Sequence, residues 1–88
     1  MSRFIGGSAA AMAREIAEGY IMVTRATLRR FSPQELRQLQ FEIDRLISNL
    51  RAEQTATDEP LVIQRRNRKL SRLMQVNRMI QAMQMRRA

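Results

Sequence analysis

A helix-start signal followed by a long apolar seam dominates the middle of this 88-residue chain. Ser32, Pro33 and Glu35 supply an N-cap side chain, a first-turn proline and the glutamate of a capping box. Five large apolar residues then recur at intervals of three and four, which is the spacing of one helix face: Leu36, Leu39, Ile43, Leu46 and Leu50. The pattern predicts a helix over residues 33–54 that must bury one face against another helix.

Two further helices are expected on either side of this segment. After a tail over residues 1–7, Ser8 can cap a segment whose apolar residues keep helical spacing to about residue 30, although Gly19 and two threonines weaken that pattern. Residues 55–60 combine threonine, acidic residues and proline and are expected to form a linker. Nothing in residues 61–87 breaks a helix, so a single helical domain over residues 8–88 is predicted, with helices at 8–30, 33–54 and 61–87.

The expected fold class is all-α. Three long helices of similar length favour antiparallel neighbours, either as a three-helix bundle or as a hairpin of the last two helices that dimerises into four. We expect the oligomer, because a chain of this size builds only a small core of its own. The predicted contact between copies comprises the central seam, Leu36, Leu39, Ile43, Leu46 and Leu50, together with Leu70, Leu73, Asn77 and Ile80.

Asn77 interrupts the apolar seam of the last segment between Leu73 and Ile80. A buried asparagine at such a position costs stability but selects one register or one oligomeric state. The alternative is that Asn77 lies at the solvated edge of the seam. The sequence leaves both alternatives open.

The composition argues against catalysis. The chain contains no Cys and no His, so it lacks a thiolate, the usual general base and the commonest metal ligand. The carboxylate pairs Glu15 with Glu18 and Glu42 with Asp44 are interpreted as acidic surface positions, and no glycine-rich phosphate loop is present. We therefore expect a protein that is not an enzyme and has no metal, no cofactor and no small-molecule substrate.

Charge is distributed unevenly along the chain. The net charge is +8, and residues 61–88 hold eight basic residues and no acidic one. Five of the eight fall within one short stretch near the start of the predicted last helix: Arg65, Arg66, Arg68, Lys69 and Arg72. Positive charge there opposes the helix dipole, and neighbours three or four residues apart repel each other. The cluster therefore predicts an anionic partner, either nucleic acid or an acidic protein, unless it is simply a solvated face.

Nucleic-acid phosphates are the partner that we expect. The guanidinium group of Arg can donate two hydrogen bonds to one phosphate. No aromatic residue is interleaved with the cluster, so stacking on single-stranded bases is disfavoured and duplex DNA or structured RNA is favoured.

The second half of the last segment is rich in methionine. Met74, Met79 and Met83 belong to a wide apolar arc, which indicates either an adaptable partner-binding surface or an ordinary core filled with methionine. A protein-interaction adaptor or regulatory subunit is therefore the alternative function. A peripheral membrane protein is a weaker alternative, suggested by basic and apolar zones on one helix.

Targeting signals are weak in this sequence. No apolar run approaches the ~20 residues that span a bilayer. The first residues do not form a secretory signal, because Gly6-Gly7 and then Arg14 and Glu15 interrupt the apolar stretch. We expect a cytoplasmic protein, with a mitochondrial presequence as the lesser alternative.

Overall fold

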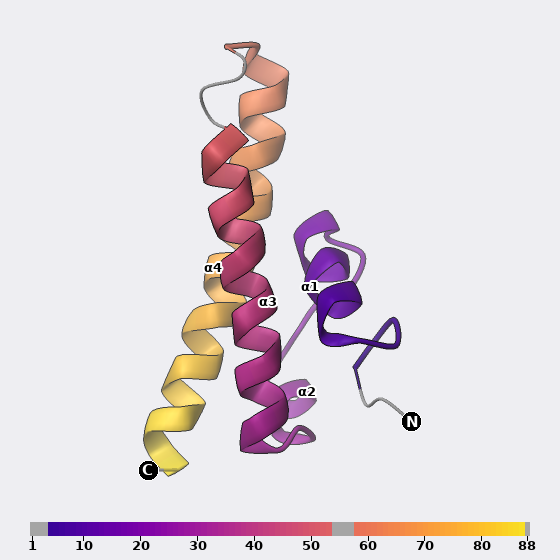
Figure 1. The fold of residues 1–88 in the computed structure, drawn as a ribbon, viewed down its shortest axis with the longest axis vertical. Helices are drawn as coiled ribbons and strands as arrows, with labels where there is room; N and C mark the ends of the chain where they lie inside the picture. Colours follow the sequence, from indigo (N-terminus) through magenta and orange to yellow (C-terminus); the bar gives the residue numbers. More distant parts are fainter. Residues whose placement is uncertain (1–3, 54–57, 88) are drawn as a thin grey trace.

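A computed structural model describes residues 4–53 and 58–87, and in this part of the chain it contains four helices and no strand. These are α1 (Ala9–Glu18), α2 (Arg25–Arg29), α3 (Pro33–Ala52) and α4 (Pro60–Arg87). The helices α3 and α4 form an antiparallel hairpin, and α1 packs against both of them (Figure 1). The expected all-α fold class and the helical bundle are confirmed.

The start of α3 has the predicted capping box. The Ser32 hydroxyl oxygen accepts a hydrogen bond from the Glu35 backbone N–H at 3.1 Å, and Glu35 Oε1 accepts one from the Ser32 backbone N–H at 2.8 Å. The helix ends at Ala52, and α4 begins at Pro60. Residues 54–57, which include half of the expected linker, lie outside the described residues.

The prediction of one helix over residues 8–30 is wrong. The helix α1 begins after its Ser8 cap as expected, but it ends at Glu18 because Gly19 adopts a left-handed conformation with φ of 77°. The backbone N–H groups of Gly19 and Tyr20 donate to the carbonyl oxygens of Ile16 and Glu15, both at 3.1 Å. This arrangement satisfies carbonyl groups that the end of the helix leaves free.

A separate short helix follows the break. Residues 20–24 are not helical, and Thr24 then caps α2 by accepting a hydrogen bond from the Thr27 backbone N–H at 3.3 Å. Threonine competes with the helix for backbone hydrogen bonds and is therefore favoured at such a cap. The second part of the predicted first helix is thus a loop followed by the five residues of α2.

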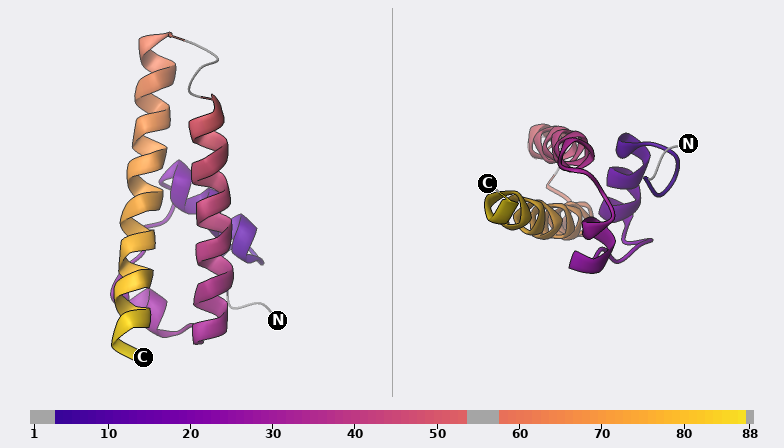
Figure 2. Two further views of the ribbon diagram at one scale, coloured as in Figure 1. Left: turned by 60° about the vertical axis from the view of Figure 1, so that its left-hand side comes forward. Right: turned by 90° about the horizontal axis from the view of Figure 1, so that it is seen from below.

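The core lies where α1, α3 and α4 meet, and all three helices contribute fully buried side chains to it (Figure 2, right). These include Met12, Ala13, Leu36, Leu39, Ile43, Leu73 and Ile80. On α1 the buried face alternates large and small residues, because Met12 and Ile16 are buried beside Ala13 and Ala17.

One end of the hairpin extends beyond the two shorter helices. The helix α4 has 28 residues and α3 has 20, so at ~1.5 Å per residue α4 is roughly 12 Å longer. The helices α1 and α2 lie along the middle and the other end of the hairpin, away from the first turns of α4 (Figures 1 and 2).

Candidate anion-binding surface on the C-terminal helix

The seam predicted to join two copies is packed inside a single chain. Leu36, Leu39, Ile43, Leu73 and Ile80 are fully buried. Leu46, Leu50 and Leu70 are half-buried and pack against the same core. These residues pack within one chain, where α1 contacts both helices of the hairpin, and a contact between two copies through them stays a prediction.

Asn77 lies at the edge of the core rather than in its centre. Its Nδ2 atom donates a hydrogen bond to Asp44 Oδ1 on α3 at 2.9 Å, and the adjacent Val76 is the residue that is buried. Asn77 is half-buried, and its Oδ1 atom is buried without a hydrogen-bond partner among the described residues, so it combines features of both alternatives. The hydrogen bond joins the two long helices and favours one register between them.

Arg65 and Arg68 are the freely exposed members of the basic cluster. Both side chains are exposed, and neither has a hydrogen bond or ion pair with any residue that the structure describes. They are three residues apart and therefore lie on one face of α4, about one turn from each other. Both guanidinium groups are therefore accessible, and their contact with phosphates stays a prediction.

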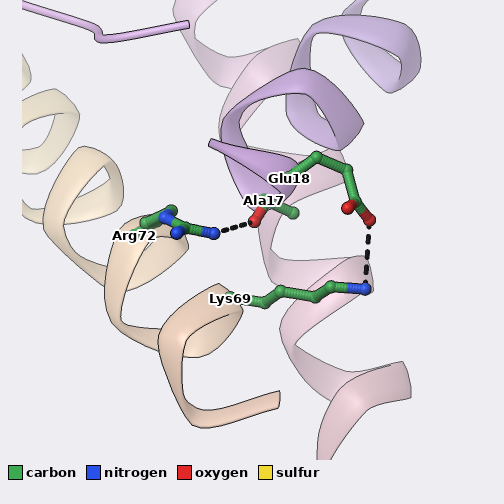
Figure 3. Close-up of polar contacts among 4 residues, drawn as sticks. All are labelled: Ala17, Glu18, Lys69 and Arg72. Atoms are coloured by element: carbon green, nitrogen blue, oxygen red, sulfur yellow. Dashed lines mark hydrogen bonds and ion pairs between the residues drawn. The ribbon is translucent and has the colours of Figure 1, made fainter. Parts of the chain in front are cut away.

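Lys69 and Arg72 instead hold the end of α1 (Figure 3). Arg72 Nη1 donates a hydrogen bond to the carbonyl oxygen of Ala17 at 2.9 Å, and Lys69 Nζ lies 3.0 Å from Glu18 Oε1. The last carbonyl groups of a helix carry partial negative charge and lack partners within the helix. Two of the five predicted phosphate contacts are thus engaged within the chain.

Arg66 is buried, which the sequence analysis missed. Its side chain is 5% exposed, and among the described residues neither Nη1 nor Nη2 has a hydrogen-bond partner. The signal was present in the sequence, because Arg66, Leu73 and Ile80 are spaced by seven residues and so occupy the same face of α4. A surface role for Arg66 alongside Arg65 and Arg68 is therefore corrected.

The methionine-rich half of α4 contributes to the core. Met74, Met79 and Met83 are half-buried and pack against the core residues. Met79 also lines a groove of about 250 Å³ together with residues 21–23, the loop that follows α1. Met74 lines a second groove together with Leu70, Ser71 and Arg78. The three methionines thus pack against the core, and two of them, Met74 and Met79, also face a groove.

Two of the carboxylates considered for catalysis have structural partners. Glu18 pairs with Lys69, and Asp44 accepts the hydrogen bond from Asn77. Within residues 4–53 and 58–87, no three Asp or Glu side chains come together in a way that could hold a metal ion. In the same part of the chain, no helix combines the length and hydrophobicity needed to cross a membrane.

Comparison with known proteins identifies no relative of this chain. No protein-family model matches the chain, and no match is found among curated proteins or solved structures.

Proposed function

We propose that this chain is a non-enzymatic helical protein that binds the phosphates of duplex DNA or structured RNA through the exposed basic side of α4. Arg65 and Arg68 are the principal contacts. One observation carries the proposal: both guanidinium groups are exposed and lack a partner within the described residues, on a helix that contains no carboxylate.

The electrostatics of α4 support an anionic ligand. Arg65 and Arg68 are helical neighbours of like charge, and in the free protein they repel each other. A phosphate between or beside them removes this repulsion and accepts hydrogen bonds from the planar guanidinium groups. Local helix stability does not explain this arrangement, whereas phosphate binding does.

The remaining basic residues of the cluster contribute less directly. Lys69 and Arg72 add positive potential, but a phosphate that took their hydrogen bonds would release the end of α1. Arg66 is buried and does not face this surface. The contact surface is therefore centred on Arg65 and Arg68, nearer the start of α4 than the five-residue cluster suggested.

A titration of labelled duplex DNA and of a labelled RNA hairpin, each at two salt concentrations, tests the proposal. We expect binding at low salt that weakens as salt rises, since each neutralised phosphate releases counterions. The double variant Arg65→Gln/Arg68→Gln is expected to bind much more weakly. The matched control is Arg37→Gln/Arg45→Gln, which removes the same charge from exposed positions on α3. No binding at low salt, or equal losses in both variants, would contradict the proposal.

The alternative role as a protein-interaction adaptor has a narrower basis. The side chain of Met22 is exposed beside the groove that Met79 lines, which offers a partner a small apolar contact. Because Met74, Met79 and Met83 already pack against the core, the apolar arc leaves less surface for a partner than its sequence suggested.

A further inference from the structure

The side of α4 that faces away from the core is polar and carries no acidic residue. Ser71 and Gln75 each lie two positions from the buried Leu73, and two positions correspond to about 200° around a helix of ~3.6 residues per turn. The side chains on this face are exposed, and none has a hydrogen bond or ion pair with a described residue. We call this face the outer stripe, and its residues follow each other at helical spacing: Gln64, Asn67, Arg68, Ser71, Gln75 and Arg78.

No other described helix covers the outer stripe. Two adjoining grooves run along it, and both are lined by Asn67 and Ser71. The other lining residues belong to α4 itself, apart from Asp58, which lies just before the helix. The helices α1 and α3 pack on the opposite side of α4 (Figure 2, right). The outer stripe is therefore open to a ligand along its length.

Positive charge and uncharged hydrogen-bonding groups alternate along the outer stripe. Arg68 and Arg78 are ten residues apart, which is roughly 15 Å along the helix axis. Between them, Ser71 and Gln75 supply a hydroxyl group and an amide group. Asp58 is the one carboxylate that lines either groove, and it lies before the start of α4. An anionic ligand is therefore favoured along the interval from Arg68 to Arg78.

Duplex DNA presents groups in the matching order. Its major groove is about 12 Å wide and accepts an α-helix, with phosphates along both sides and base edges at the floor. A helix that lies in this groove can place one guanidinium group near each strand and the amide groups between them at the bases. Asn and Gln side chains form paired hydrogen bonds with N6 and N7 of adenine. The major groove of an RNA duplex is too deep and narrow for this contact.

We propose that α4 enters the major groove of duplex DNA with its outer stripe, where Asn67 and Gln75 contact base edges and favour adenine. Arg65 and Arg68 bind phosphates of one strand, and Arg78 binds a phosphate of the other. This contact rests on the proposed nucleic-acid binding and makes it selective for DNA over RNA and for particular base sequences. From Asn67 to Arg78 the stripe is roughly 17 Å long, so one copy reads about five base pairs.

Selection from a pool of duplex DNA with a randomised central segment tests the base contacts. The full-length wild type should enrich a short motif that contains adenine. The double variant Asn67→Ala/Gln75→Ala should bind this motif roughly 5- to 150-fold more weakly, which is the range for one lost base pair contact. Its affinity for unselected duplex should be unchanged, because phosphate contacts carry no sequence information.

A matched variant controls for the loss of amide groups. Gln38→Ala/Asn49→Ala removes the same two kinds of side chain from exposed positions on α3 and should enrich the wild-type motif. Both double variants should remain folded by circular dichroism, because the positions are exposed and alanine has the higher helix propensity.

Modified bases identify the groove. Replacing the adenines of the motif by 7-deazaadenine removes the N7 acceptor from the major groove. This should weaken binding of the wild type but not of Asn67→Ala/Gln75→Ala. Salt-dependent binding without an enriched motif, a motif that the double variant still enriches, or indifference to 7-deazaadenine would each overturn the major-groove contact and leave phosphate binding by Arg65 and Arg68 intact. Absence of any binding to unselected duplex at low salt would overturn both.

Discussion

Arg72 on α4 donates a hydrogen bond to the carbonyl oxygen of Ala17 on α1 at 2.9 Å, one residue before that helix ends. These two residues are 55 positions apart in the sequence. Arg72 lies near the middle of α4, where the dipole of its own helix has little effect, whereas a cation at the C-terminal end of another helix is favourable. Arg72 and Lys69 therefore stabilise the packing of α1 on α4. Arg65 and Arg68 remain exposed and can contact a ligand.

Replacing Arg72 tests its structural role. Arg72→Met is expected to lower the free energy of unfolding by about 0.5–1.5 kcal/mol, because the Ala17 carbonyl loses its donor. Urea denaturation followed by circular dichroism measures this. Arg68→Met is the control and should stay within about 0.5 kcal/mol of the wild type, since its side chain is exposed and unpartnered. Equal effects of the two substitutions would contradict the role of Arg72.

The turn after α1 should tolerate only glycine. A Cβ atom on Gly19 would lie 2.9 Å from Arg72 Cζ, and its φ of 77° is unfavourable for any other residue. Gly19→Ala is expected to lower the free energy of unfolding by roughly 1–3 kcal/mol. Gly7→Ala is the comparison, since Gly7 also has a positive φ but its Cβ would meet nothing within 4 Å. A smaller loss at Gly19 than at Gly7 would contradict the close contact.

The contribution of the α3 capping box to the free energy of unfolding should be measurable. Ser32→Ala removes the acceptor for the Glu35 backbone N–H and is expected to cost about 1 kcal/mol in thermal or urea denaturation. Ser48→Ala, an exposed position within the same helix, is the control and should be neutral or slightly stabilising, because alanine has the higher helix propensity. If Ser32→Ala is as neutral as Ser48→Ala, the capping box does not stabilise α3.

The core at the junction of α1, α3 and α4 should be sensitive to cavities. Leu39 is fully buried, and Leu39→Ala is expected to cost about 2–5 kcal/mol. For a domain whose total stability is about 5–15 kcal/mol, this is a large fraction. Leu61→Ala changes the same kind of side chain at an exposed position and should cost far less. Similar losses would place Leu39 outside the core.

Much of the hairpin could be predicted from local signals. The Ser32–Glu35 box and the five-residue seam define α3, and Pro60 with an unbroken stretch after it defines α4. The end of α1 at Gly19 was not predicted from the neighbouring residues. A glycine in a helical pattern either stays in the helix or caps it, and here Gly19 caps it, with the Arg72 side chain from 53 positions away lying close to it. No local pattern contains that information.

At the candidate site, the sequence likewise does not separate the roles of the five residues of the basic cluster. Its five members look alike in sequence, but the placement of α1 divides them. Lys69 and Arg72 meet the end of that helix, whereas Arg65 and Arg68 lie beyond it. The burial of Arg66 could have been predicted from its spacing of seven residues to Leu73. The charge pattern alone predicted an exposed side chain.

The salt dependence of duplex DNA binding tests the central claim most directly, because it counts the phosphates that the protein neutralises. The slope of log K against log salt should become shallower by about 2 in Arg65→Gln/Arg68→Gln, at roughly 0.9 for each lost contact. In Lys69→Gln/Arg72→Gln the slope should change less, and the main loss should be in stability. An unchanged slope in the first variant, or a larger change in the second, would contradict the assignment of Arg65 and Arg68 as the phosphate contacts.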